Sequence, residues 1–376
     1  METSKSNKKH LRELPPAKVK LLPPKPILRE SLIPQLTAAH AAIGELRGFL
    51  GGLKNPGLLI APFRKREAVA SSAIEGTRAT LEEVMEYEAL DQAGKDPKAE
   101  EENRKIQDIL EVMNYERAMA VALEELKNRP IGENLLKRTH HTLLKSVRGT
   151  NKDRGNFRKV PVAVGEYIPP VHADIPNLMN NWENYLNSKQ NESDPLIRIG
   201  VAHYQFEAIH PFLDGNGRIG RLIIPLFLCQ EGILDTPVLY ISHYLEQHKV
   251  EYQRLLHEVD MKQDWTPWLK FFLKAVEEQA KITTLMAKDI QDLYEQLKTE
   301  VVGEIRSQHA IALLDLIFSN PILTATNVRE TISARSKGTA YNLLDKFMRA
   351  GVLKEHNWGG KEKIYGFTAL RKIIKA

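Results

Sequence analysis

Apolar residues recur every three or four positions along most of the chain, a spacing that places them on one face of an α-helix. The polar and proline-rich stretches between these segments predict the connections. The spacing predicts helices over residues 33–51, 61–73, 103–126, 132–144, 175–187, 196–209, 222–229, 277–300, 310–318, 326–332 and 336–349, with further helices that begin at Thr80 and that hold Tyr252. The chain is therefore predicted to be mainly α.

Two parts of the chain depart from the helical spacing. Residues 160–170 are rich in β-branched side chains around Gly165, which predicts a short β-hairpin. Residues 352–355 and 363–367 predict two strands joined by a glycine-containing turn. Three helices followed by two strands resemble a winged helix-turn-helix, so we expect such a domain at the end of the chain.

Shifts in composition along the 376 residues predict the domain organisation. Residues 1–26 combine lysines with two proline pairs, which predicts a flexible tail. We expect an N-terminal helical region over 27–102, which ends in a charged connector, and a helical core with trailing helices over 103–303. The winged helix-turn-helix is expected over 304–376.

Charge, cysteine content and hydropathy indicate the cellular compartment and the kinds of partner that the protein can have. The formal net charge is +5, and residues 304–376 hold twelve Lys and Arg against six Asp and Glu, so the basic excess lies there. Cys229 is the one cysteine, which excludes an intrachain disulfide and makes the cytoplasm the expected location. No stretch approaches the ~20 apolar residues that cross a bilayer, so no membrane partner is expected.

Residues 210–221 carry the candidate chemistry, and their sequence is His-Pro-Phe-Leu-Asp-Gly-Asn-Gly-Arg-Ile-Gly-Arg. The run connects two predicted helices, and its glycines allow the backbone to bend so that successive N–H groups can bind an anion ahead of the second helix. Arg218 and Arg221 share the first turn of that helix and suit a polyphosphate. Asp214 offers an oxygen ligand to Mg²⁺, and His210 is the expected proton acceptor.

The same run matches the pattern His-Pro-Phe-x-Asp/Glu-Gly-Asn-Gly-Arg-x-x-Arg at every fixed position, and the chain resembles the Fic family. Residues 202–209 are similar to the family's lead-in helix. The resemblance implies a Fic-type helical core in which AMP is transferred from ATP, with Mg²⁺, to a Ser, Thr or Tyr hydroxyl of a protein, the chain itself included. Gly217 stands where the kinases of this fold have lysine, which argues against that chemistry.

The resemblance also implies the role of single residues. His210 becomes the catalytic base and Asp214 the metal ligand, while Arg218 and Arg221 hold the β- and γ-phosphates. Tyr252 is expected to face the base or ribose, although Gln253 stands where the family often has a second tyrosine. The remaining residues implied to contact the nucleotide are Glu75, Gln205, Gly215, Asn216 and Gly217.

An earlier segment resembles the family's inhibitory motif, with Ser71, Glu75 and Gly76 in the fixed places. A carboxylate at position 75 paired with Arg221 would occupy the guanidinium that holds the γ-phosphate, so the chain is expected to be autoinhibited.

The predicted hairpin corresponds to the family's flap beside the active site. The resemblance implies that an extended target segment docks along it through main-chain hydrogen bonds. The residues expected to form this docking edge are Val162, Ala163, Val164 and Gly165.

Two alternative functions remain open from the sequence. Glu75 could orient a water molecule, so that the same site removes AMP from a modified protein. The chain could instead be a DNA-binding regulator whose nucleotide site only senses ATP, with Arg335, Lys337, Lys346 and Arg349 facing a DNA groove. A homodimer is compatible with either function, and the target protein and side chain are not determined by the sequence.

Overall fold

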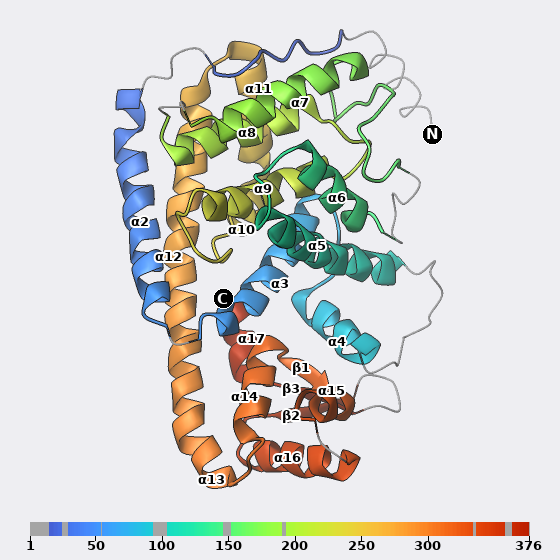
Figure 1. Cartoon of the computed structure of the whole chain (residues 1–376), viewed down its shortest axis with the longest axis vertical. Helices are drawn as coiled ribbons and strands as arrows, with labels where there is room; N and C mark the ends of the chain where they lie inside the picture. Colours follow the sequence, from blue (N-terminus) through green and yellow to red (C-terminus); the bar gives the residue numbers. More distant parts are fainter. Residues whose placement is uncertain are drawn as a thin grey trace. The chain divides into compact units, whose positions relative to one another are not determined.

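The computed structural model describes residues 15–24, 29–53, 55–92, 104–145, 152–189, 193–333, 336–357 and 363–375 (Figure 1). The chain is mainly helical, as predicted from the spacing of its apolar residues. Its elements in chain order are η1 (Arg29–Leu32), α2 (Ile33–Gly51), α3 (Gly57–Ile74), α4 (Leu81–Gln92), α5 (Arg104–Leu126), α6 (Glu133–Leu143), η2 (His172–Asp174), α7 (Ile175–Asn187), α8 (Pro195–Ile209), α9 (Asn216–Gln230), α10 (Ser242–Gln247), α11 (Lys249–Lys262), α12 (Trp265–Leu297), the π-helical turn η3 (Lys298–Val302), α13 (Gly303–Ile305), α14 (Ala310–Ser319), β1 (Ile322–Thr324), α15 (Ala325–Thr331), α16 (Lys337–Arg349), β2 (Lys354–Asn357), β3 (Lys363–Gly366) and α17 (Thr368–Lys375).

The first of two compact units is built from residues up to 44 and residues 114–279. Its central element is α8, which is buried on nearly every side and packs against α7 and α9. A helix that is apolar all round belongs in a core, because no face of it suits water. Gly200 allows α12 to approach closely, since a Cβ there would lie 3.0 Å from Leu269 and Phe272.

The second unit comprises residues 45–113 and 280–376. Within it, α3 packs against α14 and α17, and α4 packs against β1. Glu82 of α4 forms ion pairs with Arg371 and Lys375 of α17, and Lys65 of α3 pairs with Glu88 of α4. The helices near residues 57–92 therefore belong to the same compact unit as the C-terminal elements, and the domain limits expected from the sequence stay a prediction.

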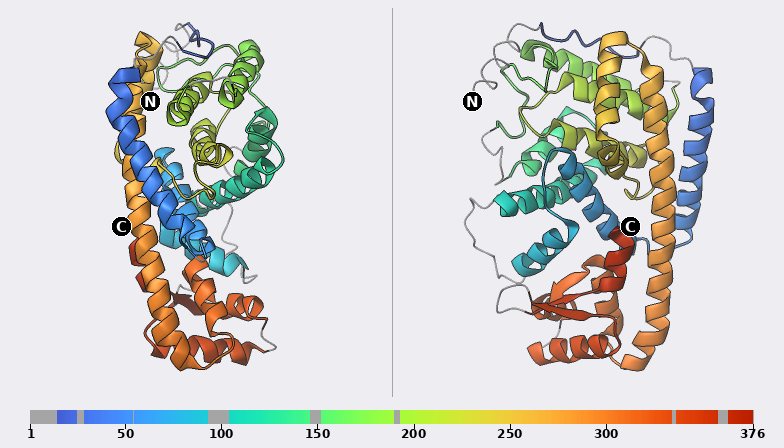
Figure 2. Two further views of the ribbon diagram at one scale, coloured as in Figure 1. Left: turned by 60° about the vertical axis from the view of Figure 1, so that its left-hand side comes forward. Right: turned by 180° about the vertical axis from the view of Figure 1, so that it is seen from behind.

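The described strands form one small antiparallel sheet in the order β1-β3-β2 (Figure 2). Gly366 is opposite Ile322 on one side and Lys354 on the other. The sequence predicted β2 and β3 but missed β1, which has three residues, and α17, which follows the last strand. Gly359, Gly360 and Arg335 lie outside the described residues.

Helices α3 and α12 begin earlier than their apolar spacing predicted, as does α9, which begins at Asn216 and not at 222. Helix α3 begins at Gly57, so Pro62 lies inside it, although a proline was expected near its start. Helix α12 begins at Trp265 and includes the aromatic residues that precede the predicted start at 277. Tertiary packing sets these limits, and a single-sequence pattern does not contain it.

Residues 15–24 are extended, but they are hydrogen-bonded to the first unit. The N–H of Ala17 donates to the carbonyl of Ile168 at 2.8 Å, and Leu22 exchanges hydrogen bonds of 2.7 and 2.9 Å with the Asn181 side chain. The sequence had predicted a flexible tail over 1–26. The described part of that segment is instead packed on the body, because its backbone groups find partners there.

None of the helices in the described part of the chain has the length and apolar character needed to cross a membrane.

Candidate active site

The loop that was singled out in the sequence begins where α8 ends. His210 caps the helix with a left-handed backbone, φ 49° and ψ 60°, and its N–H donates to the Phe206 carbonyl at 3.0 Å. This conformation costs a residue with a β-carbon about 1 kcal/mol, so surrounding contacts must hold it. The turn leaves the imidazole partly exposed, in the wall of a cavity.

The Asn216 side chain holds the middle of the loop through two hydrogen bonds to the backbone of Phe212. The Asn216 side-chain oxygen accepts from the N–H of Phe212 at 2.8 Å, and its Nδ2 donates to the Phe212 carbonyl at 2.9 Å. Asn216 is 1% exposed, so these bonds are shielded from water. In this structure the carboxamide shapes the loop, whereas its predicted contact with a phosphate stays a prediction.

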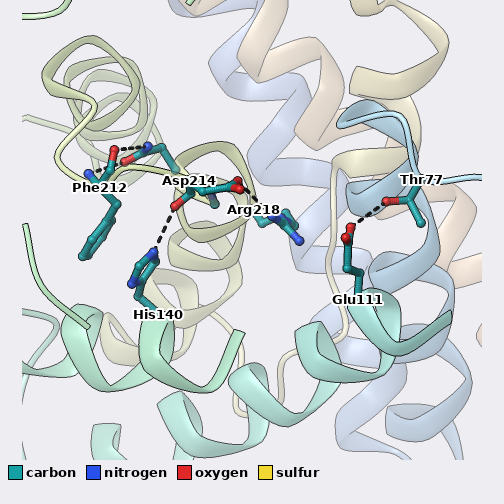
Figure 3. Close-up of polar contacts among 8 residues, drawn as sticks. Thr77, Glu111, His140, Phe212, Asp214 and Arg218 are labelled. Carbon is teal, nitrogen blue, oxygen red and sulfur yellow. Dashed lines mark hydrogen bonds and ion pairs between the residues drawn. The ribbon is translucent and has the colours of Figure 1, made fainter. Parts of the chain in front are cut away.

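Asp214 links the loop to the start of α9. Its Oδ1 accepts from the N–H of Gly215 at 2.6 Å and from Nη2 of Arg218 at 3.3 Å (Figure 3). The Gly215 amide that was predicted to meet a phosphate therefore donates to a carboxylate here. Arg218 and Arg221 are 4% and 2% exposed in the first turns of α9. Two buried guanidiniums in the first turns of a helix add to the positive field of its N-terminus, which favours an anion nearby.

The last carbonyls of α8 are bonded by side chains from the hairpin segment. Nε of Arg158 donates to the His210 carbonyl at 2.9 Å, and Nη2 donates to the Ile209 carbonyl at 3.4 Å. The hydroxyl of Tyr167 donates to the Ala208 carbonyl at 2.8 Å. Helix ends lack internal donors for these carbonyls, so the hairpin segment completes the end of α8.

The predicted hairpin is present as a single antiparallel bridge between Val164 and Tyr167. Their backbone groups exchange hydrogen bonds of 2.9 and 3.0 Å around a turn in which Gly165 has φ 59°. Val162, Ala163, Val164 and Gly165 all lie in its first arm and turn, and Val164 is 44% exposed.

A buried imidazole that the sequence analysis did not identify supports the loop from α6. Nε2 of His140 lies 2.9 Å from the Asp214 carbonyl (Figure 3), and Nδ1 accepts from the N–H of Gly155 at 2.9 Å. Because Nδ1 accepts, the proton of the neutral ring is on Nε2 and points to Asp214. Burial lowers the pKa of His140 to about 4, and its ring stacks on Phe212 with 3.9 Å between centroids.

A second buried imidazole, that of His203, is hydrogen-bonded to Tyr252, which was predicted to face the nucleotide. Nδ1 of His203 lies 3.0 Å from the Gly220 carbonyl, and Nε2 lies 2.9 Å from the Tyr252 hydroxyl. Tyr252 is 4% exposed and is not among the residues of the cavity beside His210, whereas its neighbour Gln253 is. That Tyr252 faces the base or ribose stays a prediction, and its hydroxyl is bonded to His203.

The cavity next to His210 has a volume of about 400 Å³. It is bounded by the hairpin on one side and by α8 and α11 on the others. Burial raises the pKa of the Asp260 carboxyl in its wall, and the nearby His257 lowers it by less. The residues that line it are Val164, Gly165, Glu166, Tyr167, Tyr204, Glu207, Ala208, His210, Gln253, Leu256, His257 and Asp260.

Gln205 was predicted to contact the nucleotide but points elsewhere. It is 2% exposed, and its Nε2 donates to the Lys20 carbonyl at 2.7 Å, so it anchors the extended segment 15–24. It lines a smaller cavity of about 110 Å³ beneath that segment and not the one beside His210.

The segment predicted to be inhibitory belongs to the other unit. Ser71 is fully buried in α3, Glu75 caps the helix in an exposed position, and Gly76 follows with φ 94°. The next residues are bonded to α5. Thr77 Oγ1 donates to Glu111 at 3.2 Å (Figure 3), and the N–H of Arg78 donates to Asp108 at 2.9 Å. The pairing of Glu75 with Arg221 stays a prediction.

The fit of the site to Mg²⁺ depends on Asp214. Its side chain is 38% exposed, and it is a carboxylate next to a loop of backbone amides. Magnesium in nucleotide sites is commonly held by one or two carboxylates together with phosphate oxygens and water. Asp214 fits this arrangement as the one protein carboxylate.

The fold and the loop define a helical protein built around a glycine-containing turn at the N-terminus of α9. Two sequence profiles match it: the Fic/DOC family N-terminal region over residues 33–124 and the Fic/DOC family domain over residues 130–228. Together they cover about half of the chain. The chain belongs to the Fic/DOC family.

Similar proteins carry the name protein adenylyltransferase Fic. The chain is 31% identical to the one from Drosophila grimshawi over 156 residues, which are 41% of this chain and 31% of that protein. It is 37% identical to the one from Aedes aegypti over 124 residues, which are 33% of this chain and 23% of that protein. The matched part thus spans less than a third of the length of these relatives.

Solved structures share the fold. A Fic family protein from Desulfovibrio desulfuricans superposes with a TM-score of 0.56 at 24% identity, covering 92% of this chain and 98% of that one. Fic-1 from C. elegans superposes with a TM-score of 0.53 at 20% identity, covering 69% of this chain and 75% of that one. At this level of identity the comparison establishes the fold alone.

Proposed function

We propose that the chain transfers AMP from ATP to a hydroxyl group of a protein. The observation that carries the proposal is the position of His210 in the wall of a cavity, directly ahead of a glycine loop and two buried arginines. The names of the similar proteins agree with this activity.

In the proposed reaction the hydroxyl oxygen attacks the α-phosphorus of ATP while His210 takes the hydroxyl proton. The bond to the β-phosphate oxygen breaks and pyrophosphate leaves. The amides at the start of α9 and the guanidiniums of Arg218 and Arg221 stabilise the negative charge of the phosphates as the bond breaks. Asp214 would hold the Mg²⁺ that neutralises the phosphate oxygens.

The cavity provides room for the rest of the nucleotide and for the acceptor. Leu256 and Ala208 supply apolar surface, while Gln253 and Asp260 offer hydrogen bonds. Small-molecule sites combine such surfaces with a few polar groups. The exposed arm of the hairpin offers its edge to an extended segment of the target protein, which would bring a Ser, Thr or Tyr hydroxyl to His210.

Intact-mass analysis of the purified chain after incubation with ATP and Mg²⁺ tests the proposal. We expect an AMP adduct on the chain or on an added protein, and we expect the His210→Ala variant to form it at least about 10²-fold more slowly, because it lacks the base. Unchanged thermal unfolding of the variant is the control for folding. Adduct formation at the same rate in His210→Ala would contradict the mechanism, and no adduct under any condition would contradict the activity.

We further propose that Glu75 inhibits this activity by pairing with Arg221. Removal of AMP from a modified protein is the alternative use of the same residues, with Glu75 orienting a water molecule. Incubating an AMP-modified target with the chain distinguishes the two, because only the hydrolytic reaction releases free AMP.

A second candidate is a regulator that binds DNA through a winged helix-turn-helix. It is favoured by the order α14, β1, α15, α16, β2, β3 and by the exposed basic residues of α16, Lys337, Lys346 and Arg349. Arg349 pairs with Asp345 at 2.8 Å, so a phosphate would compete with a carboxylate there. A gel-shift titration of the full chain at low and high salt tests it, and salt-insensitive or absent binding would contradict it.

A further inference from the structure

Helix α8 ends where the chain turns through His210. The last carbonyls of a helix have no donor within the helix, and those left in the core need partners from elsewhere. Here one buried side chain, Arg158, donates to two of them. It comes from a part of the chain about fifty residues earlier.

The guanidinium of Arg158 donates hydrogen bonds to two parts of the chain, the end of α8 and the hairpin segment. Nε and Nη2 donate to the carbonyls of His210 and Ile209 at 2.9 and 3.4 Å. Nη1 and Nη2 also donate to the carbonyls of Val160 and Pro170 at 3.2 and 2.6 Å. The backbone N–H of Arg158 donates to the Pro211 carbonyl at 2.8 Å, so the main chain contacts the same turn.

These partners lie on both sides of the candidate active site. Val160 and Pro170 flank the hairpin turn at 165 and 166, so one planar group sets the spacing of the two arms. His210 carries the imidazole in the wall of the cavity that the hairpin also lines. Arg158 is 2% exposed, and its bonds therefore face little competition from water.

We propose that Arg158 is a positioning residue for the transfer reaction. It holds His210 in the left-handed conformation that aims its imidazole at the cavity, and it holds both arms of the hairpin at the matching distance. The proposal rests on the proposed function for its catalytic part and on the geometry for its structural part. Arg158 does not touch the reacting atoms.

Lysine cannot replace this group. A guanidinium presents five N–H donors in a rigid plane, whereas an ammonium presents three donors from a single point on a flexible stem. Arg158→Lys keeps the charge and most of the volume but cannot reach four carbonyls on two segments. The variant should therefore lose the alignment of His210 with the hairpin while the helices of the unit remain folded.

Arg198 provides a matched control at the other end of α8, the helix whose end Arg158 contacts. It is 6% exposed in the first turn of α8, donates to the Ser188 carbonyl at 3.3 Å and pairs with Glu231. Arg198→Lys disturbs a buried guanidinium to a similar degree but at the opposite end of α8. The comparison separates the effect of alignment from a general loss of stability.

The first experiment measures AMP transfer by the full-length Glu75→Gly chain, with the Arg158→Lys or Arg198→Lys change added. We expect kcat to fall about 10²-fold in Arg158→Lys with KM for ATP changed little, because the base is misplaced while the phosphate site is intact. Arg158→Ala should regain part of its rate when guanidinium chloride is added at millimolar concentration. Arg198→Lys should keep its kcat even if its unfolding temperature falls.

The second experiment is hydrogen–deuterium exchange on the same proteins without nucleotide. We expect faster exchange in peptides covering 159–171 and 206–213 in Arg158→Lys, and no such change in Arg198→Lys. An unchanged kcat in Arg158→Lys, or unchanged exchange in both peptides, would overturn the inference. A parent chain that transfers no AMP would instead contradict the proposed function, and the exchange experiment would still decide whether Arg158 holds the turn.

Discussion

The path of the active-site loop depends on the backbone of Gly215. Its φ is 77°, and a Cβ at this position would lie 3.1 Å from Leu143 Cδ2. Left-handed backbone is unfavourable for residues with a β-carbon, and the neighbouring Leu143 is fully buried. The glycine was identified from the motif, but the close contact with α6 was not.

Gly215→Ala should lower the free energy of unfolding by about 1–2 kcal/mol, because alanine resists the positive φ and meets Leu143. Urea unfolding followed by tryptophan fluorescence measures the change. Gly44→Ala is the control, since it lies in α2 with no atom within 4 Å of the added Cβ. It should stabilise by about 0.5–1 kcal/mol, as alanine does in an exposed helix. Equal effects of the two substitutions would contradict the argument.

The residues of the motif could be predicted from the sequence, but their supports could not. His210, Asp214 and Asn216 lie within seven positions of one another, so their spacing alone brought them together. Arg158 and His140 reach the loop from 52 and 74 residues away, and both bond to backbone carbonyls. Because every residue has a carbonyl, such a contact leaves no complementary residue type in the sequence.

At the level of single elements, the end of α3 determines where Glu75 is presented. The N–H of Gly76 donates to the Ala73 carbonyl and that of Thr77 to the Ser72 carbonyl, at 2.9 and 3.2 Å. Gly76 has φ 94°, which completes a glycine-terminated helix end. The glycine of the inhibitory motif therefore has a structural role, and the carboxylate precedes it in an exposed position.

Glu75→Gly should raise the initial rate of AMP transfer about 10-fold, which corresponds to removing roughly 1.4 kcal/mol of competition at Arg221. A radiolabelled α-phosphate assay measures the rate. Glu75→Gln separates charge from size, and it should also raise the rate because a neutral amide pairs weakly with a guanidinium. A rate unchanged in both variants would remove the inhibitory role from Glu75.

Long helices with regularly spaced apolar residues were predicted more accurately than short strands. Helices such as α7 and α16 were found within one residue of their ends, because their apolar faces persist over several turns. The three residues of β1 carry too little pattern to be recognised, and β1 exists because β3 pairs with it. The hairpin was predicted, although it contains a single bridge.

For the whole molecule, the burial of histidines determines how stability responds to pH. His203 is fully buried in the first unit, and burial lowers its pKa from 6.5 to about 4. Between these values the unfolded chain binds a proton that the folded chain does not. The free energy of unfolding therefore falls as the pH drops from 6.5 to 4, with no further contribution from this group below that range.

One such histidine lowers the free energy of unfolding by up to about 1.4 kcal/mol for each pH unit. His140 contributes in the same direction, since its pKa is also lowered to about 4 by burial. Urea titrations between pH 7 and pH 4.5 measure the slope, followed through the fluorescence of Trp182, Trp265 and Trp268 in that unit. His203→Gln should lower the slope of the free energy of unfolding against pH by the equivalent of about one bound proton. An unchanged slope would contradict the assignment of a neutral buried imidazole to His203.

Local order along the chain determined the helices, the hairpin and the twelve-residue motif, because each depends on residues that are close in sequence. Tertiary structure alone decided that residues 45–113 join residues 280–376 in one unit, and that Gln205 faces the extended segment 15–24. It also decided that Arg158 holds the turn at His210. These arrangements depend on which distant surfaces exclude water together and which backbone groups remain to be bonded, and neither is contained in a local pattern.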